Sequence, residues 1–234
     1  MSLYSGIEVG GPNGLTYAVL LARLPRAELL EVLTEERFSG WVGPTEDGWT
    51  VAVPEVPAGH VAARRRRVPE LAELVAGRTG VVVAGAVVLK DEVLRLWAGH
   101  GDRQLIDYVS DPSVGAEEAP LELDPFGNPV GVSDGPVGAQ DARALARELD
   151  RPEVADDLQQ VLAERLGESE NESERLQSVA RLLGWPSWLV AVDSLPRRVP
   201  GGPAASAFAR LRVGRTGIGG LAAAQAARAV RRKA

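Results

Sequence analysis

The sequence contains no cysteine, one methionine and only two histidines, His60 and His100. The absence of cysteine excludes disulfide bonds, thiolate nucleophiles and zinc sites that use Cys ligands. Neither histidine has a second histidine at helical spacing, so the sequence indicates no metal site and no cofactor. A Ser-His-Asp arrangement would need one of these two histidines, and no Gly-x-Ser-x-Gly elbow precedes a helical segment.

Long apolar runs and targeting signals are also absent from the sequence. No apolar run approaches the roughly 20 residues that a membrane-spanning helix needs. The first residues lack the basic segment followed by an apolar segment that is typical of a signal peptide. We therefore expect no membrane association and a cytoplasmic location.

The composition itself is typical of a globular protein, with 234 residues of which 45% are hydrophobic and 25% are charged. The net charge of −6 is unevenly distributed along the chain. Residues 111–174 carry 17 acidic and 4 basic residues, whereas residues 195–234 carry nine basic residues and no acidic one. This asymmetry indicates either a charged partner or a basic segment that lies against the acidic segment of its own chain.

The stretch 79–111 is the most apolar and β-branched part of the chain. Three apolar runs are joined there by two short polar turns, Lys90-Asp91 and Gly101-Asp102, which predicts an antiparallel meander. The first run contains consecutive valines, which predicts a strand that is buried on both faces. Gly85 interrupts this run and marks either a β-bulge or a close approach of another backbone.

Six elements are predicted up to this point, in the order strand, helix, strand, strand, helix, strand. The last of them is the first strand of the meander. The predicted ranges are 15–24, 25–37, 38–42, 49–53, 69–76 and 81–89, with Gly77 ending the second helix. Trp41 and Trp49 flank the turn of the predicted hairpin, where they could pair across the strands.

This order is that of a ferredoxin-like βαββαβ unit. We therefore predict an α+β fold in which an antiparallel sheet, extended by the meander, carries helices on one face. A more curved sheet with the same element order is the alternative.

The second half of the chain indicates a separate helical region. Three helices are predicted at 141–149, from Pro152 to before Gly167, and from a capping box at Ser169–Glu172 to before Gly184. The apolar segment 185–192 fits either a short helix opened by Pro186 or a strand. We thus divide the chain into an α+β sheet domain (1–110), an acidic Pro- and Gly-rich loop or linker (111–138), a helical region packed on or beside the sheet (139–202) and a basic Ala-, Gly- and Arg-rich tail (203–234).

The candidate binding residues are a run of four arginines and two tryptophans: Arg64, Arg65, Arg66, Arg67, Trp185 and Trp188. Arginine binds carboxylates and phosphates through two parallel hydrogen bonds. The run fits a solvated surface, a contact with an acidic protein, or a phosphate or nucleic-acid contact. Nucleic-acid binding would require a wider basic field, and residues 1–110 are net negative.

Two further segments invite comparison with known chemistry. The glycine-rich segment 214–220 lacks the spacing of a P-loop and of a dinucleotide-binding loop, so we interpret it as a flexible part of the tail. Asp107, Tyr108 and Asp111 lie at the end of a predicted strand, where they could form the rim of a site.

Three functional hypotheses follow from these observations. The first is a non-catalytic protein–protein interaction module that acts through its acidic or basic regions. The second is a small hydrolase or transferase that uses Asp or Glu as acid and base. The third is phosphate or nucleic-acid binding through Arg64–Arg67 and the basic tail. The sequence defines no catalytic residue, no cofactor and no oligomeric state.

Overall fold

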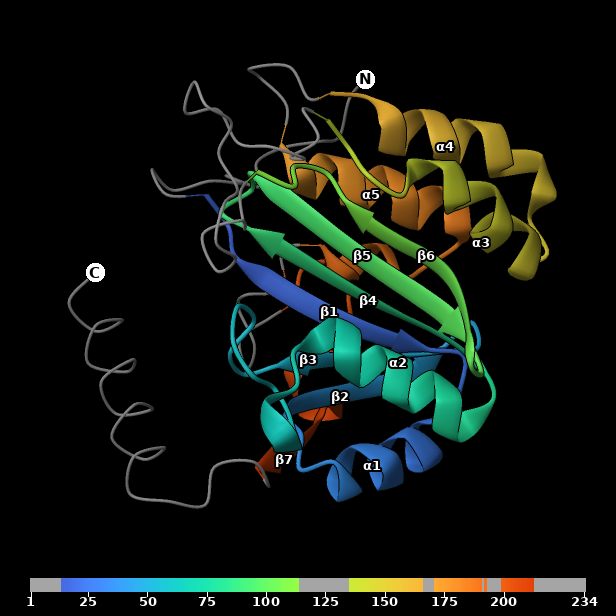
Figure 1. Cartoon of the computed structure of the whole chain (residues 1–234). Helices are drawn as coiled ribbons and strands as arrows, with labels where there is room; N and C mark the ends of the chain where they lie inside the picture. The colour runs from blue at the N-terminus through green and yellow to red at the C-terminus, as the bar shows by residue number, and fades with distance from the viewer. Residues whose placement is uncertain (1–13, 114–134, 166–170, 191, 193–198, 213–234) are drawn as a thin grey trace.

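The computed structural model describes residues 14–113, 135–165, 171–190, 192 and 199–212 (Figure 1). In this part of the chain, seven strands form one antiparallel sheet in the order β6-β5-β4-β1-β3-β2-β7. The strands are β1 (Tyr17–Ala22), β2 (Ser39–Glu46), β3 (Trp49–Pro54), β4 (Val82–Leu89), β5 (Val93–His100), β6 (Arg103–Val109) and β7 (Ala209–Arg212). The helices are α1 (Arg26–Glu35), α2 (Val68–Thr79), α3 (Ala142–Glu148), α4 (Ala155–Ala163) and α5 (Glu172–Leu183).

The first four strands have the order β4-β1-β3-β2, with α1 joining β1 to β2 and α2 joining β3 to β4. Because β3 lies between β1 and β2, the β1-α1-β2 connection spans one intervening strand, as in a split βαβ unit. The prediction of an α+β fold with an antiparallel sheet is confirmed, and so is its extension by the meander of β4, β5 and β6.

One face of the sheet is covered by α1 and α2 (Figure 1). Their apolar stripes, which include Leu29 and Leu33 of α1 and Leu71 of α2, are fully buried against side chains such as Leu20 and Val83. Gly85 allows α2 to lie close to β4, since a Cβ atom there would be 3.0 Å from Val68 Cγ1. The pairing of β4 with β5 continues through Gly85 without a shift, so the glycine marks a close approach rather than a bulge.

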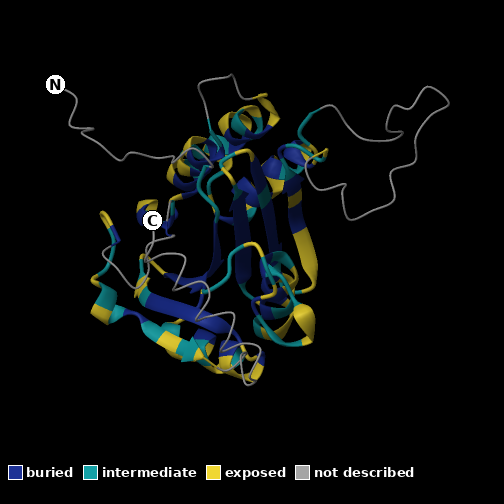
Figure 2. Ribbon diagram, turned by 90° about the vertical axis from the view of Figure 1, so that its left-hand side faces the viewer, coloured by how far each residue is buried: buried dark blue, intermediate teal, exposed yellow. Residues whose placement is uncertain are grey.

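The opposite face is covered by α3, α4 and α5. Leu145, Leu158, Leu176 and Val179 are fully buried in one apolar cluster with sheet residues such as Leu96. Figure 2 shows most of the sheet as buried, between helices whose outer surfaces are exposed. The described part of the helical region therefore packs on the sheet and completes a three-layer arrangement; the domain division itself stays a prediction.

Two local predictions about the first half of the chain are wrong. Trp41 does not pair with Trp49, because Trp41 lies opposite Val53 and Trp49 lies opposite Glu46. The register of β2 shifts between Val42 and Thr45, where Pro44 cannot donate a backbone hydrogen bond.

Helix α2 also does not end at Gly77. It continues to Thr79, and the following residue, Gly80, adopts the left-handed conformation (φ 66°) that ends many helices.

The second half of the chain also differs from the sequence prediction in detail. Helix α5 begins after Asn171, whose side chain accepts a hydrogen bond from the backbone N–H of Glu174 at 3.0 Å, so Asn171 rather than Ser169 provides the N-cap. Residues Ser187–Leu189 form a single 3₁₀ turn that follows Pro186. Strand β7 was not predicted; it pairs with β2 and adds part of the expected basic tail to the sheet.

None of the helices in the described residues combines the length and the apolar character that crossing a membrane requires. The cellular compartment stays a prediction.

Candidate functional site

A buried polar cluster lies between the sheet and α5, where the sequence predicts only apolar packing. Its centre is Arg175, whose side chain is 2% exposed and forms a 3.0 Å ion pair with the equally buried Glu172. Arg175 Nη1 also donates to the phenolic oxygen of Tyr108 at 2.6 Å. A charged pair at this depth needs its remaining hydrogen-bonding groups satisfied, because desolvation otherwise outweighs the attraction of the two charges.

The remaining donors of Arg175 point at the end of α4. The guanidinium donates to the backbone carbonyls of Val161 and Leu162 at 3.1 Å each and to that of Glu164 at 2.7 Å. The last carbonyls of a helix have no partner within the helix, and its C-terminus attracts positive charge. Arg175 therefore caps α4, holds Tyr108 of β6 and neutralises Glu172, so that one side chain joins three elements.

Burial changes the ionisation of the other members of this cluster. Desolvation raises the pKa of Glu172, and this effect exceeds the opposing attraction of Arg175 and the hydrogen bond with Ser110. Desolvation also raises the pKa of the Tyr108 phenol, against the lowering influence of Arg175. Raised carboxyl pKa values occur at catalytic sites and also in structural ion pairs. Here the carboxylate of Glu172 is engaged by Arg175, which favours the structural role.

A second set of contacts ties the start of α5 to the turn between β4 and β5. Asp91 accepts hydrogen bonds from the Ser173 hydroxyl and, at 2.7 Å, from the backbone N–H of Leu15. Tyr17 donates its hydroxyl proton to Ser173 at 3.0 Å, and the backbone N–H of Glu172 donates to the Asp91 carbonyl at 3.0 Å. These contacts fix the position of α5 over β1.

His100 belongs to a cluster with Glu148 and Arg103 that the sequence does not indicate. Its Nδ1 atom and the guanidinium of Arg103 both contact the carboxylate of Glu148 at the end of α3, and its Nε2 atom lies 3.0 Å from the carbonyl oxygen of Gly80. Partial burial raises the pKa of Glu148, but the hydrogen bonds from His100 and Arg103 outweigh this effect and lower it. The side chains of His100 and Arg103 are 41% and 64% exposed, so this is a surface cluster that holds α3 against the β5–β6 turn.

The two candidate tryptophans lie in the apolar core. Trp185 and Trp188 are 4% and 6% exposed. Trp185 packs edge-on against Trp49 with ring centres 6.1 Å apart, and Trp188 packs edge-on against Phe208 at 5.7 Å. The indole N–H of Trp188 donates to Glu46 at 2.8 Å. This burial leaves little of either ring for a partner, and their role in binding stays a prediction.

The four candidate arginines have different surroundings. Arg66 is half-buried, and its guanidinium donates to the buried carboxylate of Glu36 at 2.5 Å. The backbone N–H of Arg67 donates to the Glu70 carboxylate in the first turn of α2. Arg64 and Arg65 are exposed, and neither has an acidic partner among the residues that the structure describes. The run thus divides into structural residues and outward-facing ones.

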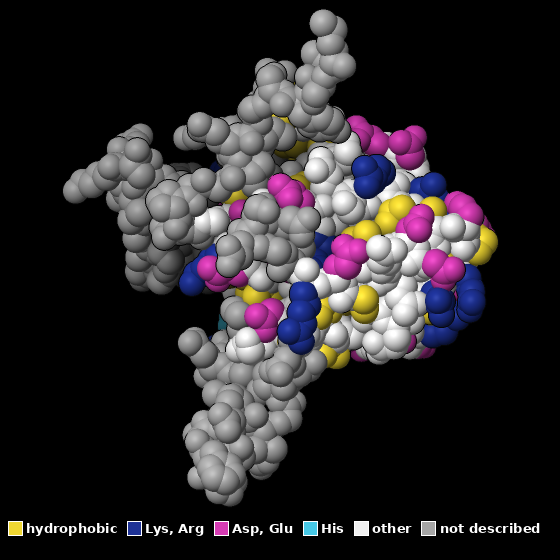
Figure 3. All heavy atoms as spheres, turned by 90° about the horizontal axis from the view of Figure 1, so that it is seen from above, with side chains coloured by type: hydrophobic (Ala, Val, Ile, Leu, Met, Phe, Trp, Pro, Cys, Tyr) yellow, Lys and Arg dark blue, Asp and Glu magenta, His cyan; other side chains and the backbone are white. Residues whose placement is uncertain are grey.

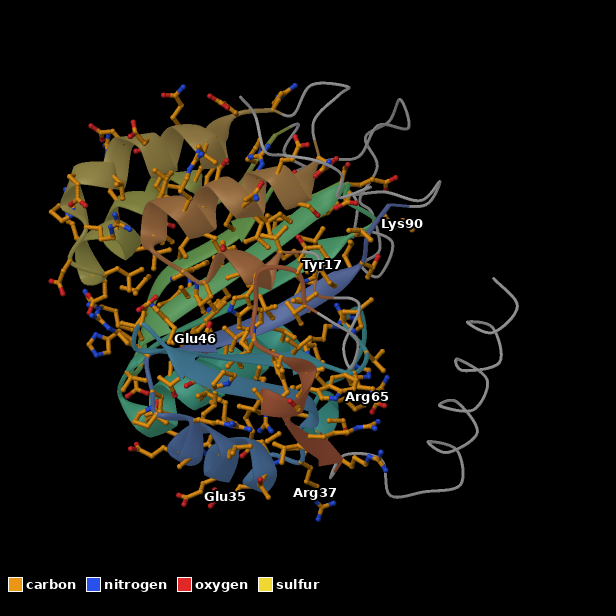
Figure 4. All side chains as sticks on the ribbon, turned by 180° about the vertical axis from the view of Figure 1, so that it is seen from behind. Tyr17, Glu35, Arg37, Glu46, Arg65 and Lys90 are labelled. Carbon is orange, nitrogen blue, oxygen red and sulfur yellow. The ribbon has the colours of Figure 1, made fainter. Side chains whose placement is uncertain are left out.

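Two further exposed arginines from other parts of the chain lie near Arg64 and Arg65. The carbonyl of Glu36, the residue before Arg37, accepts a hydrogen bond from the backbone N–H of Ala63 at 2.7 Å. Arg212 of β7 lies opposite Ser39 in the sheet, and the backbone N–H of Ser39 donates to Val61 at 3.0 Å. We call Arg37, Arg64, Arg65 and Arg212 the basic end. Figure 4 labels two of its members, with Arg37 at the lower end of the molecule and Arg65 above it at the right-hand edge.

Three acidic residues near the basic end are already paired. Glu36 is held by Arg66 and, at 2.8 Å, by Arg78; Glu35 is also held by Arg78, and Glu55 pairs with Arg210 at 3.0 Å. Over the C-terminal helices, by contrast, Figure 3 shows basic side chains dispersed among acidic ones. Within the part of the chain that the structure describes, the basic end therefore carries positive charge that no ion pair compensates.

Other predicted features give no site within the described residues. No group of three or more His, Asp or Glu side chains is arranged there to hold a metal ion. Of the predicted rim, Tyr108 is fully buried, Asp107 is exposed, and Asp111 accepts hydrogen bonds from Ser113. The glycine-rich segment 214–220 and most of the acidic segment 111–138 lie outside the described residues.

Comparisons with known proteins give no relative from which a function could be inferred. No protein-family model matches the chain, and neither the curated proteins nor the solved structures gave a match.

Proposed function

We propose that this protein is a non-catalytic binding module that uses the basic end to dock an acidic protein partner. The observation that carries the proposal is the gathering of four exposed arginines from three separate segments, none of which has an acidic partner among the described residues. Such a localised charge increases the rate of association with an oppositely charged protein and favours one docking orientation.

The contacts of two ionisable clusters support structural roles for them. Arg175 and Glu172 connect α5, α4 and β6, and Glu148 connects α3 to the β5–β6 turn. A catalytic acid or base has to reach a substrate, and the side chain of Glu172 is 3% exposed. The basic end is exposed, and its guanidinium groups are therefore accessible to a partner.

The charge of the whole chain favours a protein over a nucleic acid. Nucleic acids present long runs of phosphates and bind extended basic surfaces, whereas this chain has a net charge of −6. Exposed Glu28, Glu31 and Glu73 on α1 and α2 would repel a polyanion that extended beyond the basic end. A short acidic segment of a protein could contact the four arginines without meeting these carboxylates.

The test is capture of the partner by the tagged full-length protein, followed by its identification and a binding measurement with the purified partner. The double substitution Arg37→Glu and Arg212→Glu should abolish capture at low salt, because it reverses half of the positive charge at the basic end. The wild-type complex should also weaken as salt is raised, since exposed charges are screened. A matched control reverses Arg147 and Arg181, which are exposed on α3 and α5, and should capture the partner normally. Equal affinity of the double variant and the wild type would refute the proposal.

A further inference from the structure

Two consecutive arginines at the basic end have a backbone conformation that residues other than glycine seldom adopt. Arg64 has φ 54° and ψ 28°, and Arg65 has φ 59°, so both lie in the left-handed region. This region brings the Cβ atom close to the following carbonyl, and single Gly, Asn or Asp residues usually occupy it. Two adjacent arginines there indicate that the surrounding structure enforces the turn.

The contacts that enforce the turn come from both sides of it. Before the turn, the backbone N–H of Ala63 donates to the carbonyl of Glu36 at 2.7 Å, and Val61 donates to the carbonyl of Arg66 at 2.8 Å. After the turn, Arg66 donates to the carboxylate of Glu36 at 2.5 Å. The buried Glu36 therefore holds the residues on both sides of Arg64 and Arg65, and the two guanidinium groups project from a fixed base.

The position of the turn is also electrostatically unfavourable for arginine. It directly precedes the 12-residue helix α2, whose N-cap residue is Arg67. The N-terminus of a helix carries partial positive charge and attracts anions, so cations placed before it are repelled. Glu70 is the one acidic residue in the first turn of α2, and it accepts from the Arg67 backbone. An anion bound by Arg64 and Arg65 would reduce the repulsion between these charges and the helix.

We propose that Arg64 and Arg65 form a preformed binding site for a pair of carboxylates on an acidic protein segment. This inference rests on the proposed function and names the residues and ligand chemistry of the same surface. Each guanidinium can bind one carboxylate through two parallel hydrogen bonds, which the compact ammonium group of lysine cannot form. Because the turn is already fixed, binding has a smaller cost in backbone ordering.

The experiment compares two double variants in the full-length protein. Arg64→Gly with Arg65→Gly relieves the left-handed conformation and removes both guanidinium groups. Arg64→Lys with Arg65→Lys keeps the charge and the backbone conformation but removes the two-hydrogen-bond geometry. The probe is a short fluorescein-labelled polyglutamate peptide, followed by fluorescence anisotropy at low salt, and the melting temperature is measured in parallel.

The glycine pair should raise the melting temperature by about 2–4 °C and weaken peptide binding by at least about tenfold. The lysine pair should leave the melting temperature unchanged and weaken binding by about threefold to tenfold. A matched control is Lys90→Gly, because Lys90 is a cation with φ 53° in the β4–β5 turn. This control should also raise the melting temperature but should bind the peptide like the wild type.

Each of the following outcomes would overturn the inference. Wild-type peptide binding by the glycine pair would show that Arg64 and Arg65 do not bind the peptide. An unchanged melting temperature of the glycine pair would show that the left-handed conformation is not enforced. Wild-type binding by the lysine pair would show that charge alone is sufficient. Tighter, Arg64- and Arg65-dependent binding of a short single-stranded DNA would assign the site to a nucleic acid. If only the Arg37 and Arg212 variant loses the captured partner, the proposed function stands and this inference fails.

Discussion

The two faces of the sheet are held to their helices in different ways. Against α1 and α2 the contact is formed by Leu, Val and Ala side chains together with Phe38 and Trp97. Against α3, α4 and α5 the apolar contact also contains Tyr17, Tyr108 and four tryptophans, and it surrounds the buried pair of Arg175 and Glu172. The first face is packed by helices that are adjacent to their strands in the sequence, and the second by helices that follow all but one of the strands.

This difference indicates how each set of helices finds its position. Apolar contacts are non-directional, and the short connections of α1 to β1 and β2 and of α2 to β4 limit the ways in which these helices can pack. Helices α3 to α5 follow β6 after about thirty residues of chain, which returns to the sheet at Val137, where it pairs with Val109. Directional contacts therefore help to specify where these helices pack. The hydrogen bonds of Arg175 with Tyr108 and of Ser173 with Asp91 provide this specification.

The largest expected effect that tests this comparison is that of Arg175→Leu. The substitution leaves the carboxylate of Glu172 buried without its partner and removes the donors that cap α4. Removing one partner of a buried ion pair costs about 3–5 kcal/mol, so we expect the free energy of unfolding in urea to fall by about 4 kcal/mol. Arg181→Leu on the exposed side of α5 should change it by less than about 0.5 kcal/mol. Similar losses in both variants would mean that Arg175 does not hold the second face together.

The next effect belongs to the first face. Leu71→Ala removes a fully buried side chain from the contact of α2 with the sheet and should lower the free energy of unfolding by about 3 kcal/mol. Glu73→Ala, at an exposed position of the same helix, should have little effect. If each contact is local, hydrogen exchange should increase mainly in α2 for Leu71→Ala and mainly in α4 and α5 for Arg175→Leu. The same exchange pattern in both variants would contradict the distinction between the faces.

The smallest effect concerns acid sensitivity at the edge of the second face. The native pKa of Glu148 is below its ordinary value of 4.5, so the stabilisation by its carboxylate is present above that pH and is lost as the pH falls toward the native pKa. Glu148→Gln should therefore make the free energy of unfolding less dependent on pH in this acidic range. The measurement is a series of urea titrations below pH 5, with the exposed Glu153→Gln as control. An unchanged acid dependence would mean that the contacts of His100 and Arg103 do not lower the pKa.

Much of the fold could be predicted because its signals are local. Consecutive valines and short polar turns indicated the meander, and leucine spacing indicated α1 and α2. The errors occur where a residue distant in the sequence determines a helix end, a strand register or the pairing of a strand. Helix α2 continues past Gly77 and includes Arg78. Arg78 pairs with Glu35, the last residue of α1, and with Glu36, which follows it. The register of Trp41 depends on the shift near Pro44, and β7 is too short to be recognised without its partner β2.

The candidate site was predictable only in part. The arginine run was visible in the sequence, but its division into structural and outward-facing residues depends on Glu36, which lies about thirty residues earlier. The contribution of Arg37 and Arg212 required knowledge of the sheet order. One available signal was missed. Glu172 and Arg175 lie on the same helical stripe as Leu176 and Val179, and charged residues at such positions indicate a buried ion pair.

Strand β7 is synthesised after the strand β2 whose edge it covers. The outer edge of β2 and the ring of Trp41, over which Arg210 stacks at 5.2 Å, are covered by residues that leave the ribosome after every other described element. Until then a nascent chain exposes an unpaired strand edge beside an aromatic side chain, which is a template for aggregation. Chains interrupted before Ala209 would keep this edge open.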